Sequence, residues 1–344
     1  MVSAIAENPG SCDEVWLCNL SGKPTLKKSE EYIEEKLLPV AELFRSKGIT
    51  VSLQIAETVS FPKNITKRWG GGDWYNTGLS GARYGRHLFS LGLPVTYDTY
   101  AGVGYLLSEE YAELLTDDEI EALLHRPVIT SGNAIAALEK RRERIKEKLG
   151  VSAIAVNGGG CAELIAGDGK FEGTAFGVSY TKLTGNIKPL SYYALRGYRY
   201  LSEEDTVCEG VASAIAVTAY GANWFVVGYA PKETEITSDK RNMILRAADE
   251  ISGGLPAYIA ETSRLCLYPR ADSLGRTTSV TILNPSIEEA EPVELRVKNP
   301  CEKKAVWYEL DGAAVDLPAW LDGEFIKVRL PKLAAWGVGT VFLV

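Results

Sequence analysis

Two carboxylates, Glu57 and Asp73, are the residues of this chain that could act as a catalytic pair. Glu57 lies just past the end of a predicted strand, where α/β sheets place their ligands, and Asp73 lies in a loop rich in glycine and aromatic residues. A pair of carboxylates can hydrolyse a glycosidic bond when the two groups lie roughly 5 to 9.5 Å apart. No distance follows from the sequence, so the alternative interpretation is two solvated loop carboxylates.

Five further side chains could bind a substrate. Trp69, Trp74 and Tyr75 carry rings that could stack on the face of a sugar, although large aromatic side chains also fill the boundaries between domains. Asn19 and Gln54, at or near the ends of the first two predicted strands, could hydrogen-bond hydroxyl groups. A turn is the alternative role for Asn19, because Asn side chains readily bond to the nearby backbone.

The cysteines and histidines do not form the pattern of a metal site. The six cysteines include no CxxC pair, and the two histidines, His87 and His125, are far apart in sequence. A zinc site needs four clustered nitrogen or sulfur ligands, so we expect no metal and interpret the cysteines as buried free thiols. The glycine triplets at 70–72 and 158–160 match neither GxGxxG nor a phosphate-binding loop that ends in Gly-Lys-Ser/Thr. They indicate turns, and we expect no cofactor.

The composition is that of a globular chain with two or three domains. Of 344 residues, 46% are hydrophobic and 24% are charged, and the net charge of −8 has the wrong sign for binding phosphate backbones. We therefore expect no nucleic-acid partner. No stretch approaches the roughly 18 to 20 apolar residues of a membrane span, and no basic segment followed by an apolar core opens the chain. These features predict no membrane contact and a cytoplasmic location.

The first part of the chain has the pattern of a strand, a helix and a second strand. Val15–Cys18 is a short apolar run, apolar residues recur at helical spacing between Ser29 and Lys47, and Thr50–Ala56 alternates like a strand. The two strands of such a βαβ unit are parallel. The unit must join a larger sheet, because it cannot bury both of its faces alone.

Residues 83 to 251 alternate between helices and short strands. Thr116 and Glu119 have the spacing of a capping box, which opens a helix. Helices are predicted at 83–91, 116–124, 135–149 and 240–251, and strands at 93–97, 128–130, 153–156, 212–218 and 224–229. Gly132 lies in a tight turn from a strand into a helix. This alternation predicts a doubly wound α/β domain.

After residue 257 the hydrophobic period changes to two. Strands are predicted at 277–283, 292–297, 304–310, 325–330 and 339–344. Turns that contain Asn-Pro, Asp-Gly or Pro separate them, and no helical pattern lies between them. These features predict a small antiparallel β-sandwich.

The order of these parts resembles the multidomain glycoside hydrolases of family 42, the β-galactosidase type. Six stretches carry the resemblance: Cys12–Cys18 and Ile49–Ile55 look like the first strands of a TIM barrel, Arg83–Thr99 and Leu115–Leu138 like the start of the trimerisation domain, and Thr281–Pro285 and Leu333–Thr340 like the terminal sandwich. The resemblance implies a βαβ barrel remnant at 1–72, a flavodoxin-like domain similar to class I glutamine amidotransferases at 73–256, and a β-sandwich at 257–344.

The same resemblance implies that most of the barrel is absent. A complete (β/α)₈ barrel takes about 200 to 250 residues, whereas only about 70 precede the second domain. The catalytic glutamates of that family lie on later barrel strands, so neither is carried over.

Amidotransferase chemistry is also missing from the pattern. Class I amidotransferases place a cysteine nucleophile on a Gly-x-Cys-x-Gly turn, and such a cysteine needs a nearby histidine. Cys161 follows three glycines but lacks the second glycine of the motif and a matching histidine. By the order of elements the turn would lie at Gly132–Ala134, which contains no thiol. The resemblance therefore implies the fold without its chemistry.

Three hypotheses on function follow from the sequence. The first is a non-catalytic scaffold or assembly protein of carbohydrate metabolism, whose flavodoxin-like domain forms the contacts of a homo-oligomer. The second is an active glycoside hydrolase whose site is completed by a neighbouring subunit. The third is a sugar-binding module that uses Trp69 and Trp74.

Overall fold

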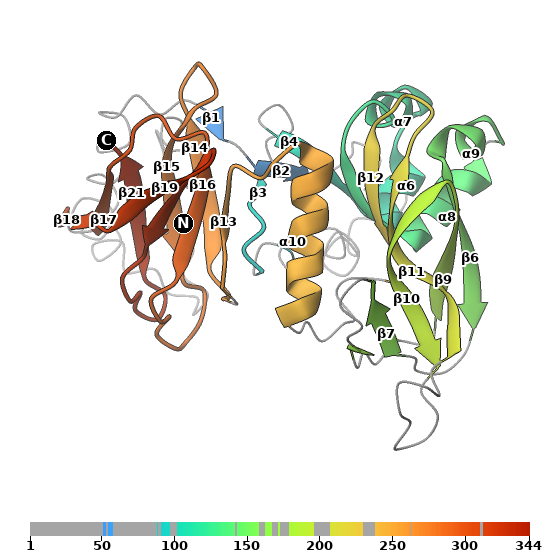
Figure 1. Ribbon diagram of the computed structural model, residues 1–344. Helices are drawn as coiled ribbons and strands as arrows, with labels where there is room; N and C mark the ends of the chain where they lie inside the picture. Colours follow the sequence, from blue (N-terminus) through green and yellow to red (C-terminus); the bar gives the residue numbers. More distant parts are fainter. Residues whose placement is uncertain are drawn as a thin grey trace, which may run out of the picture. The chain divides into compact units, whose positions relative to one another are not determined.

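The computed structural model forms two compact units (Figure 1). It describes residues 51–52, 54–57, 88, 91–96, 102–141, 143–157, 162–166, 171–172, 179–195, 207–229, 238–261, 263–309 and 312–344. The α/β unit contains the described residues of Ile55–His87 and Val103–Gly254. The sandwich unit contains those of Leu255–Val344, together with described residues up to 54 and from 88 to 102.

The α/β unit is built on a mixed sheet. Its strands are β4 (Gly102–Leu107), β5 (Val128–Ser131), β6 (Val151–Asn157), β7 (Ala162–Ile165), β8 (Phe171–Glu172), β9 (Ser179–Gly185), β10 (Ile187–Leu195), β11 (Val207–Val217) and β12 (Asn223–Val227). Strands β4, β5 and β12 are parallel neighbours. The order then continues from β12 through β11, β10 and β7 to β8 with antiparallel pairs, and β9 pairs with β6 and β11.

Five helices of the described residues belong to this unit. They are α6 (Glu109–Leu114), α7 (Asp117–Leu123), α8 (Gly132–Arg141), α9 (Glu143–Leu149) and α10 (Ser238–Ser252). The capping box of α7 is confirmed, because Thr116 Oγ1 accepts a bond from Glu119 N at 3.3 Å and Thr116 N donates to Glu119 Oε2 at 2.7 Å. The helix predicted at 135–149 is covered by α8 and α9, which lie on either side of residue 142, outside the described residues.

The core of the α/β unit lies where helices meet the sheet. Ile135 and Leu138 on α8 are fully buried and belong to one apolar cluster with Trp224 and Val226 of β12. All four residues of β5 are buried, as expected for a parallel strand covered on both faces. Packing of α8 therefore fixes the position of the strands whose ends are described below as the candidate site.

The predicted α/β class is confirmed, whereas a flavodoxin-like, doubly wound arrangement is not shown. Strands β4, β5 and β12 form a parallel part, and the strands beyond β12 are antiparallel. Strands β7, β9 and β10 were not predicted from the sequence. Pro189 lies within β10, beside a shift in its register with β11, and a proline inside a strand weakens the strand pattern.

The sandwich unit contains two antiparallel sheets. The larger has the order β1 (Val51–Ser52), β14 (Cys266–Ala271), β15 (Thr277–Leu283), β21 (Val338–Leu343), β17 (Ala305–Glu309), β18 (Ala314–Leu317). The smaller has the order β13 (Ala257–Ile259), β16 (Glu294–Lys298), β20 (Phe325–Arg329), β19 (Ala319–Asp322). Buried Leu267, Val280 and Val341 of the larger sheet and Leu295 and Val328 of the smaller form one core. The predicted antiparallel sandwich and its five predicted strands are confirmed.

Part of the segment predicted as the second barrel strand, at 50–56, forms β1. Val51 and Ser52 of β1 pair antiparallel with Ala271 and Arg270 of β14. Two further short strands follow, β2 (Gln54–Glu57) and β3 (Val95–Thr96). The first barrel strand, predicted at 15–18, lies outside the described residues, so the barrel remnant and the boundaries 1–72, 73–256 and 257–344 stay predictions.

One buried side chain, Asn284, connects two loops of the sandwich unit. Its Nδ2 lies 2.8 Å from the carbonyl oxygen of Glu288, 3.1 Å from that of Leu333 and 3.0 Å from that of Ala334. Its Oδ1 accepts a bond from Ser286 N at 3.1 Å. A single amide thereby bonds to carbonyl groups of both loops, and those of Leu333 and Ala334 also accept backbone N–H groups.

Candidate functional site

The carboxyl ends of the parallel strands are where an open α/β sheet usually binds a ligand. Two glycines follow the strands there, Gly132 after β5 and Gly228 after β12. A Cβ atom at Gly132 would lie 1.7 Å from Thr181 Oγ1, and one at Gly228 would lie 2.2 Å from the carbonyl oxygen of Thr181. Both glycines are therefore required by the close approach of β9, which carries Thr181.

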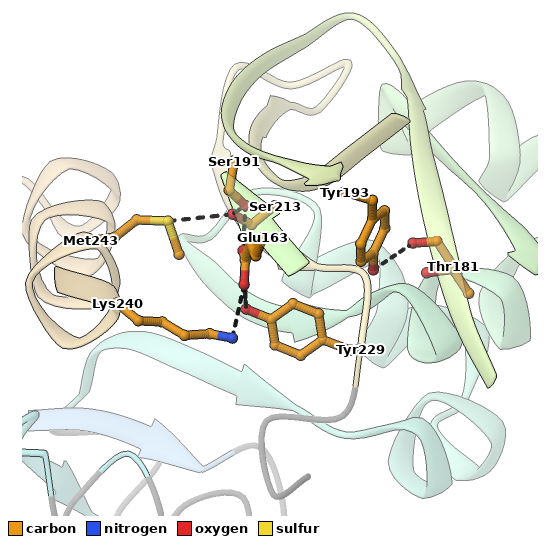
Figure 2. Close-up of polar contacts among 8 residues, drawn as sticks. All are labelled: Glu163, Thr181, Ser191, Tyr193, Ser213, Tyr229, Lys240 and Met243. Atoms are coloured by element: carbon orange, nitrogen blue, oxygen red, sulfur yellow. Dashed lines mark hydrogen bonds and ion pairs between the residues drawn. The ribbon is translucent and has the colours of Figure 1, made fainter. Parts of the chain in front are cut away.

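Hydrogen bonds hold Thr181 against these strand ends, and Figure 2 shows the one from Tyr193. Its backbone N and its Oγ1 both donate to the carbonyl oxygen of Gly228, at 2.6 and 2.9 Å. The Tyr193 hydroxyl donates to the carbonyl oxygen of Thr181 at 3.0 Å. Gly228 N in turn donates to the carbonyl oxygen of Ala212 at 2.7 Å. The polar backbone at this edge is thus bonded to protein, and a side chain of the fold fills the position beside the glycines.

A buried ion pair lies next to this edge. Glu163 of β7 and Lys240 of α10 have side chains that are 0% and 1% exposed, and Lys240 Nζ lies 2.8 Å from Glu163 Oε2 (Figure 2). The Tyr229 hydroxyl donates to both carboxylate oxygens, at 3.2 and 3.0 Å, and Lys240 Nζ lies 4.1 Å from the centre of the Tyr229 ring. The attraction between the two charges and the ring offsets part of their loss of hydration.

Two buried serines extend the cluster toward α10. The Ser191 hydroxyl of β10 donates to Glu163 Oε1 and contacts the Ser213 hydroxyl of β11. Ser213 Oγ in turn lies 3.6 Å from the sulfur of Met243, one turn after Lys240 on α10. Helix α10 therefore reaches the sheet through a charged contact and a weak hydroxyl–sulfur contact.

The Glu163 cluster has the geometry of a structural anion. A carboxylate that acts as a general acid must carry a proton, and one that acts as a nucleophile needs a free lone pair within reach of substrate. The oxygens of Glu163 instead accept hydrogen bonds from Ser191 and Tyr229 and form an ion pair with Lys240, and the side chain is fully buried. We therefore assign Glu163 and Lys240 to the positioning of α10.

A second charged cluster lies at the surface of the α/β unit. Lys148 Nζ of α9 lies 2.8 and 2.7 Å from the two carboxylate oxygens of Glu121 on α7, and the Tyr220 hydroxyl also donates to Glu121. The hydrogen bond from Lys148, then that from Tyr220, holds the pKa of Glu121 below its usual value, and the bond to Glu121 raises the pKa of Lys148. The His125 ring stacks on Tyr220 at 4.0 Å. This cluster connects two helices and a turn, and its geometry shows no reacting group.

Most of the residues predicted as site residues cannot be placed. Five lie outside the described residues: Asn19, Trp69, Asp73, Trp74 and Tyr75. Gln54 and Glu57 are the first and last residues of β2, and only their backbone is described. Cys161 and His87 also lie outside the described residues. The predicted catalytic and substrate-binding roles therefore stay predictions.

The tight turn predicted after β5 is confirmed. Strand β5 ends at Ser131 and α8 begins at Gly132, with Ala134 N donating to Ser131 Oγ at 3.2 Å. Asn133 lies at the start of α8, where an amidotransferase would carry its nucleophile according to the resemblance stated above. Among the described residues, no group of three or more His, Cys, Asp or Glu side chains could hold a metal ion.

Sequence reasoning missed Glu163 and Lys240, although both gave a signal. Glu163 is an acidic residue within the short strand Ala162–Ile165. Lys240 precedes Met243 and Ile244 by three and four residues, so it lies on the buried face of α10. A charge on the apolar face of a helix requires a buried partner. The sequence could therefore have indicated that Lys240 is paired, without identifying its partner.

Comparison with known proteins shows a likeness of fold. No family model matches the chain, and no curated protein matches its sequence. The structure is similar to that of α-L-fucosidase isoenzyme 2 from Paenibacillus thiaminolyticus, with a TM-score of 0.53 and 11% sequence identity over 89% of this chain and 51% of that one. The chain thus shares its fold with part of this fucosidase and spans about half of the fucosidase's length.

The structure is more weakly similar to two other proteins, which are named as a rhamnosidase and a xylanase. A rhamnosidase from Novosphingobium sp. PP1Y has a TM-score of 0.24 and 14% identity over 33% of this chain and 10% of that one. The catalytic domain of a GH30 xylanase C from Talaromyces cellulolyticus has a TM-score of 0.18 and 14% identity over 35% of this chain and 30% of that one. Similarities of this size carry no argument about fold or function. None of the described helices is long and apolar enough to cross a bilayer.

Proposed function

We propose that this chain is a non-catalytic scaffold or assembly protein of carbohydrate metabolism, derived from a glycoside hydrolase of the family 42 type. The observation that carries the proposal is the closed end of the parallel strands in the α/β unit. Thr181 occupies the position beside Gly132 and Gly228 where an α/β sheet of this kind would receive a ligand. In this proposal the α/β unit forms contacts between copies of the chain.

The link to carbohydrate rests on the shared fold. The fold match to an α-L-fucosidase covers 89% of this chain, which supports descent from an enzyme that acts on sugars. The resemblance of Thr281–Pro285 and Leu333–Thr340 to the terminal sandwich of family 42 enzymes supports the same origin. Fold alone does not define an activity, so the proposal assigns carbohydrate as the related chemistry and no turnover.

The alternative function is an active, β-galactosidase-like glycoside hydrolase whose site a neighbouring subunit completes. The fold match to a fucosidase is the observation that favours it. In this version Glu57 and Asp73 form the carboxylate pair, and the five other predicted residues contact the sugar. A sugar-binding module that does not hydrolyse its ligand is the third version, with Trp69 and Trp74 as its stacking residues.

A hydrolysis screen separates the first two versions. The purified protein is assayed against a panel of aryl α- and β-glycosides that includes the α-L-fucoside and the β-galactoside. Glu57→Gln is the test variant, and Glu302→Gln, at an exposed position of the sandwich unit, is the matched control. We expect no turnover by any of the three proteins. Turnover that Glu57→Gln abolishes and Glu302→Gln leaves intact would replace the scaffold with the hydrolase.

The assembly part of the proposal is tested by light scattering. The expected mass is a multiple of the 37.5 kDa chain mass at micromolar concentration. A strictly monomeric protein would contradict the proposed assembly role. Titration with oligosaccharides, followed by tryptophan fluorescence, tests the third version, which predicts a saturable change in the absence of hydrolysis.

A further inference from the structure

The sandwich unit has an open side formed by two consecutive edge strands. β18 ends the larger sheet and β19 ends the smaller sheet, and Pro318 alone separates them. Within the described residues, neither strand pairs on its outer side. We refer to residues 314–322 as the β18–β19 edge. Edge strands expose unpaired backbone N–H and C=O groups, which can pair with another strand.

The β18–β19 edge exposes several apolar side chains, together with the carboxylate of Asp316 on β18. Val315, Trp320 and Leu321 are 56%, 44% and 51% exposed. Natural edge strands are usually protected by charges, which oppose pairing with another chain. Here the carboxylate of Asp322 is already bound within the chain, 2.6 Å from Lys327 Nζ of β20. The charge at the end of β19 is therefore neutralised, and it opposes pairing less than a free carboxylate would.

The register of β19 with β20 shows which backbone groups point outward. Arg329 N donates to the carbonyl oxygen of Pro318 at 3.1 Å, and Trp320 is opposite Lys327 in the same register. Hydrogen-bonded pairs alternate along an antiparallel ladder. Residues 318, 320 and 322 therefore bond to β20, whereas the N–H and C=O groups of Ala319 and Leu321 point away from it. These two residues present two donors and two acceptors to an incoming strand.

We propose that the β18–β19 edge is an interface for a second copy of this chain, with the two β19 strands antiparallel about a twofold axis perpendicular to the sheet. Trp320 then lies opposite Trp320 of the second copy, and Leu321 lies opposite Ala319 of the second copy. The outward groups of Ala319 and Leu321 form hydrogen-bonded pairs across the axis. The two smaller sheets join into one continuous sheet.

The distribution of side chains over the two faces favours a second copy as the occupant. Leu321 is opposite buried Ile326 of β20, so it lies on the core face, and Trp320 lies on the outer face with Lys327. A twofold axis perpendicular to the sheet places core face beside core face, so both copies extend the same apolar layer. In this register Asp322 is opposite Pro318 of the second copy, and no acidic residue of β19 lies opposite another.

This inference rests on the proposed assembly role, but it adds an interface in the sandwich unit to the one proposed for the α/β unit. The first test is the variant Leu321→Lys, which places a charge on the core face of the edge. The matched control is Leu274→Lys, which changes another exposed leucine of the same unit, 75% exposed in the turn between β14 and β15. We expect Leu321→Lys to halve the mass measured by light scattering and Leu274→Lys to leave it unchanged.

A crosslinking test checks the register. Non-hydrogen-bonded pairs in antiparallel strands lie close enough for a disulfide, so Trp320→Cys forms a disulfide-linked dimer under mild oxidation, whereas Leu274→Cys does not. An oligomeric wild type whose mass Leu321→Lys does not change, with no dimer from Trp320→Cys, would overturn this interface and leave the assembly role intact. A monomeric wild type would overturn both.

Discussion

The buried pair Glu163–Lys240 provides the strongest test of how α10 is held. The variant Lys240→Met keeps the length and the apolar character of the stem but removes the ammonium group. Glu163 is then left without its counter-charge in a site that is 0% exposed, with hydroxyl donors such as Ser191 and Tyr229 beside it. Removal of one partner from a buried ion pair typically lowers the unfolding free energy by about 3–5 kcal/mol. For a unit of this size the corresponding fall in melting temperature is about 6–20 °C.

The assay is differential scanning calorimetry of the full chain, which resolves the transition of the α/β unit. Lys188→Met is the matched control, because Lys188 Nζ forms an ion pair of similar length, 2.7 Å, with Glu250, but both side chains are about half exposed. Exposed pairs contribute little, so this control leaves the transition nearly unchanged. The double variant Glu163→Gln/Lys240→Met removes both charges and recovers most of the loss.

Two results would refute this reasoning. The first is a loss below about 1 kcal/mol for Lys240→Met, which would mean that the carboxylate is solvated or neutral in the folded protein. The second is a double variant that is as unstable as the sum of the single variants. Additive losses are typical of side chains that do not interact, so they would exclude direct coupling between β7 and α10 through this pair.

Three further predictions concern other parts of the structure. Gly132→Ala places a Cβ atom 1.7 Å from Thr181 Oγ1, so we expect it to destabilise the α/β unit by about 1–3 kcal/mol in urea unfolding. Adding Thr181→Ala to this variant restores part of the loss. If Gly132→Ala had no effect on stability, β9 would not close the strand ends. The ion pair with Lys148 lowers the pKa of Glu121, so it contributes stability that is complete above the ordinary pKa of 4.5 and is lost as the pH falls through the lower pKa of the folded protein. The difference in stability between wild type and Glu121→Gln should therefore shrink in acid. A difference that grows in acid would contradict the ion pair. Burial raises the pKa of Cys266 to about 12, so at pH 8 this thiol should react with a maleimide far more slowly in the folded protein than after denaturation. Mass spectrometry measures both rates, and equal rates would mean that the thiol is exposed.

The sequence predicted the sandwich unit well because its pattern is local. In β16 and β20 buried residues alternate with residues that are mostly half-buried, so the period of two was visible without any knowledge of partners. The same holds for α7, whose start follows from Thr116 and Glu119 alone. In contrast, β18 and β19 were missed, because most of their residues are exposed and neither strand shows the alternation.

The mixed sheet was not predictable in the same way. Strands β7, β9 and β10 follow glycine-rich or polar stretches, and their partners are set by contacts between distant residues such as Thr181 and Gly228. The pairing of Glu163 with Lys240 likewise depends on the sheet order, which no local pattern encodes. The candidate residues Glu57 and Asp73 were chosen for their place in the sequence, and their roles stay predictions.

The side-chain amide of Asn284, which connects the two sandwich loops, also affects how readily the chain deamidates or is cleaved at this position. Asparagine deamidates when the next backbone nitrogen attacks the side-chain carbonyl, but Asn284 precedes Pro285, whose nitrogen carries no hydrogen. In a slower route, Nδ2 attacks the carbonyl of its own residue and cleaves the chain. That nitrogen is held by the carbonyl oxygens of Glu288, Leu333 and Ala334. The side chain on which both loops depend is therefore protected from both routes of spontaneous damage.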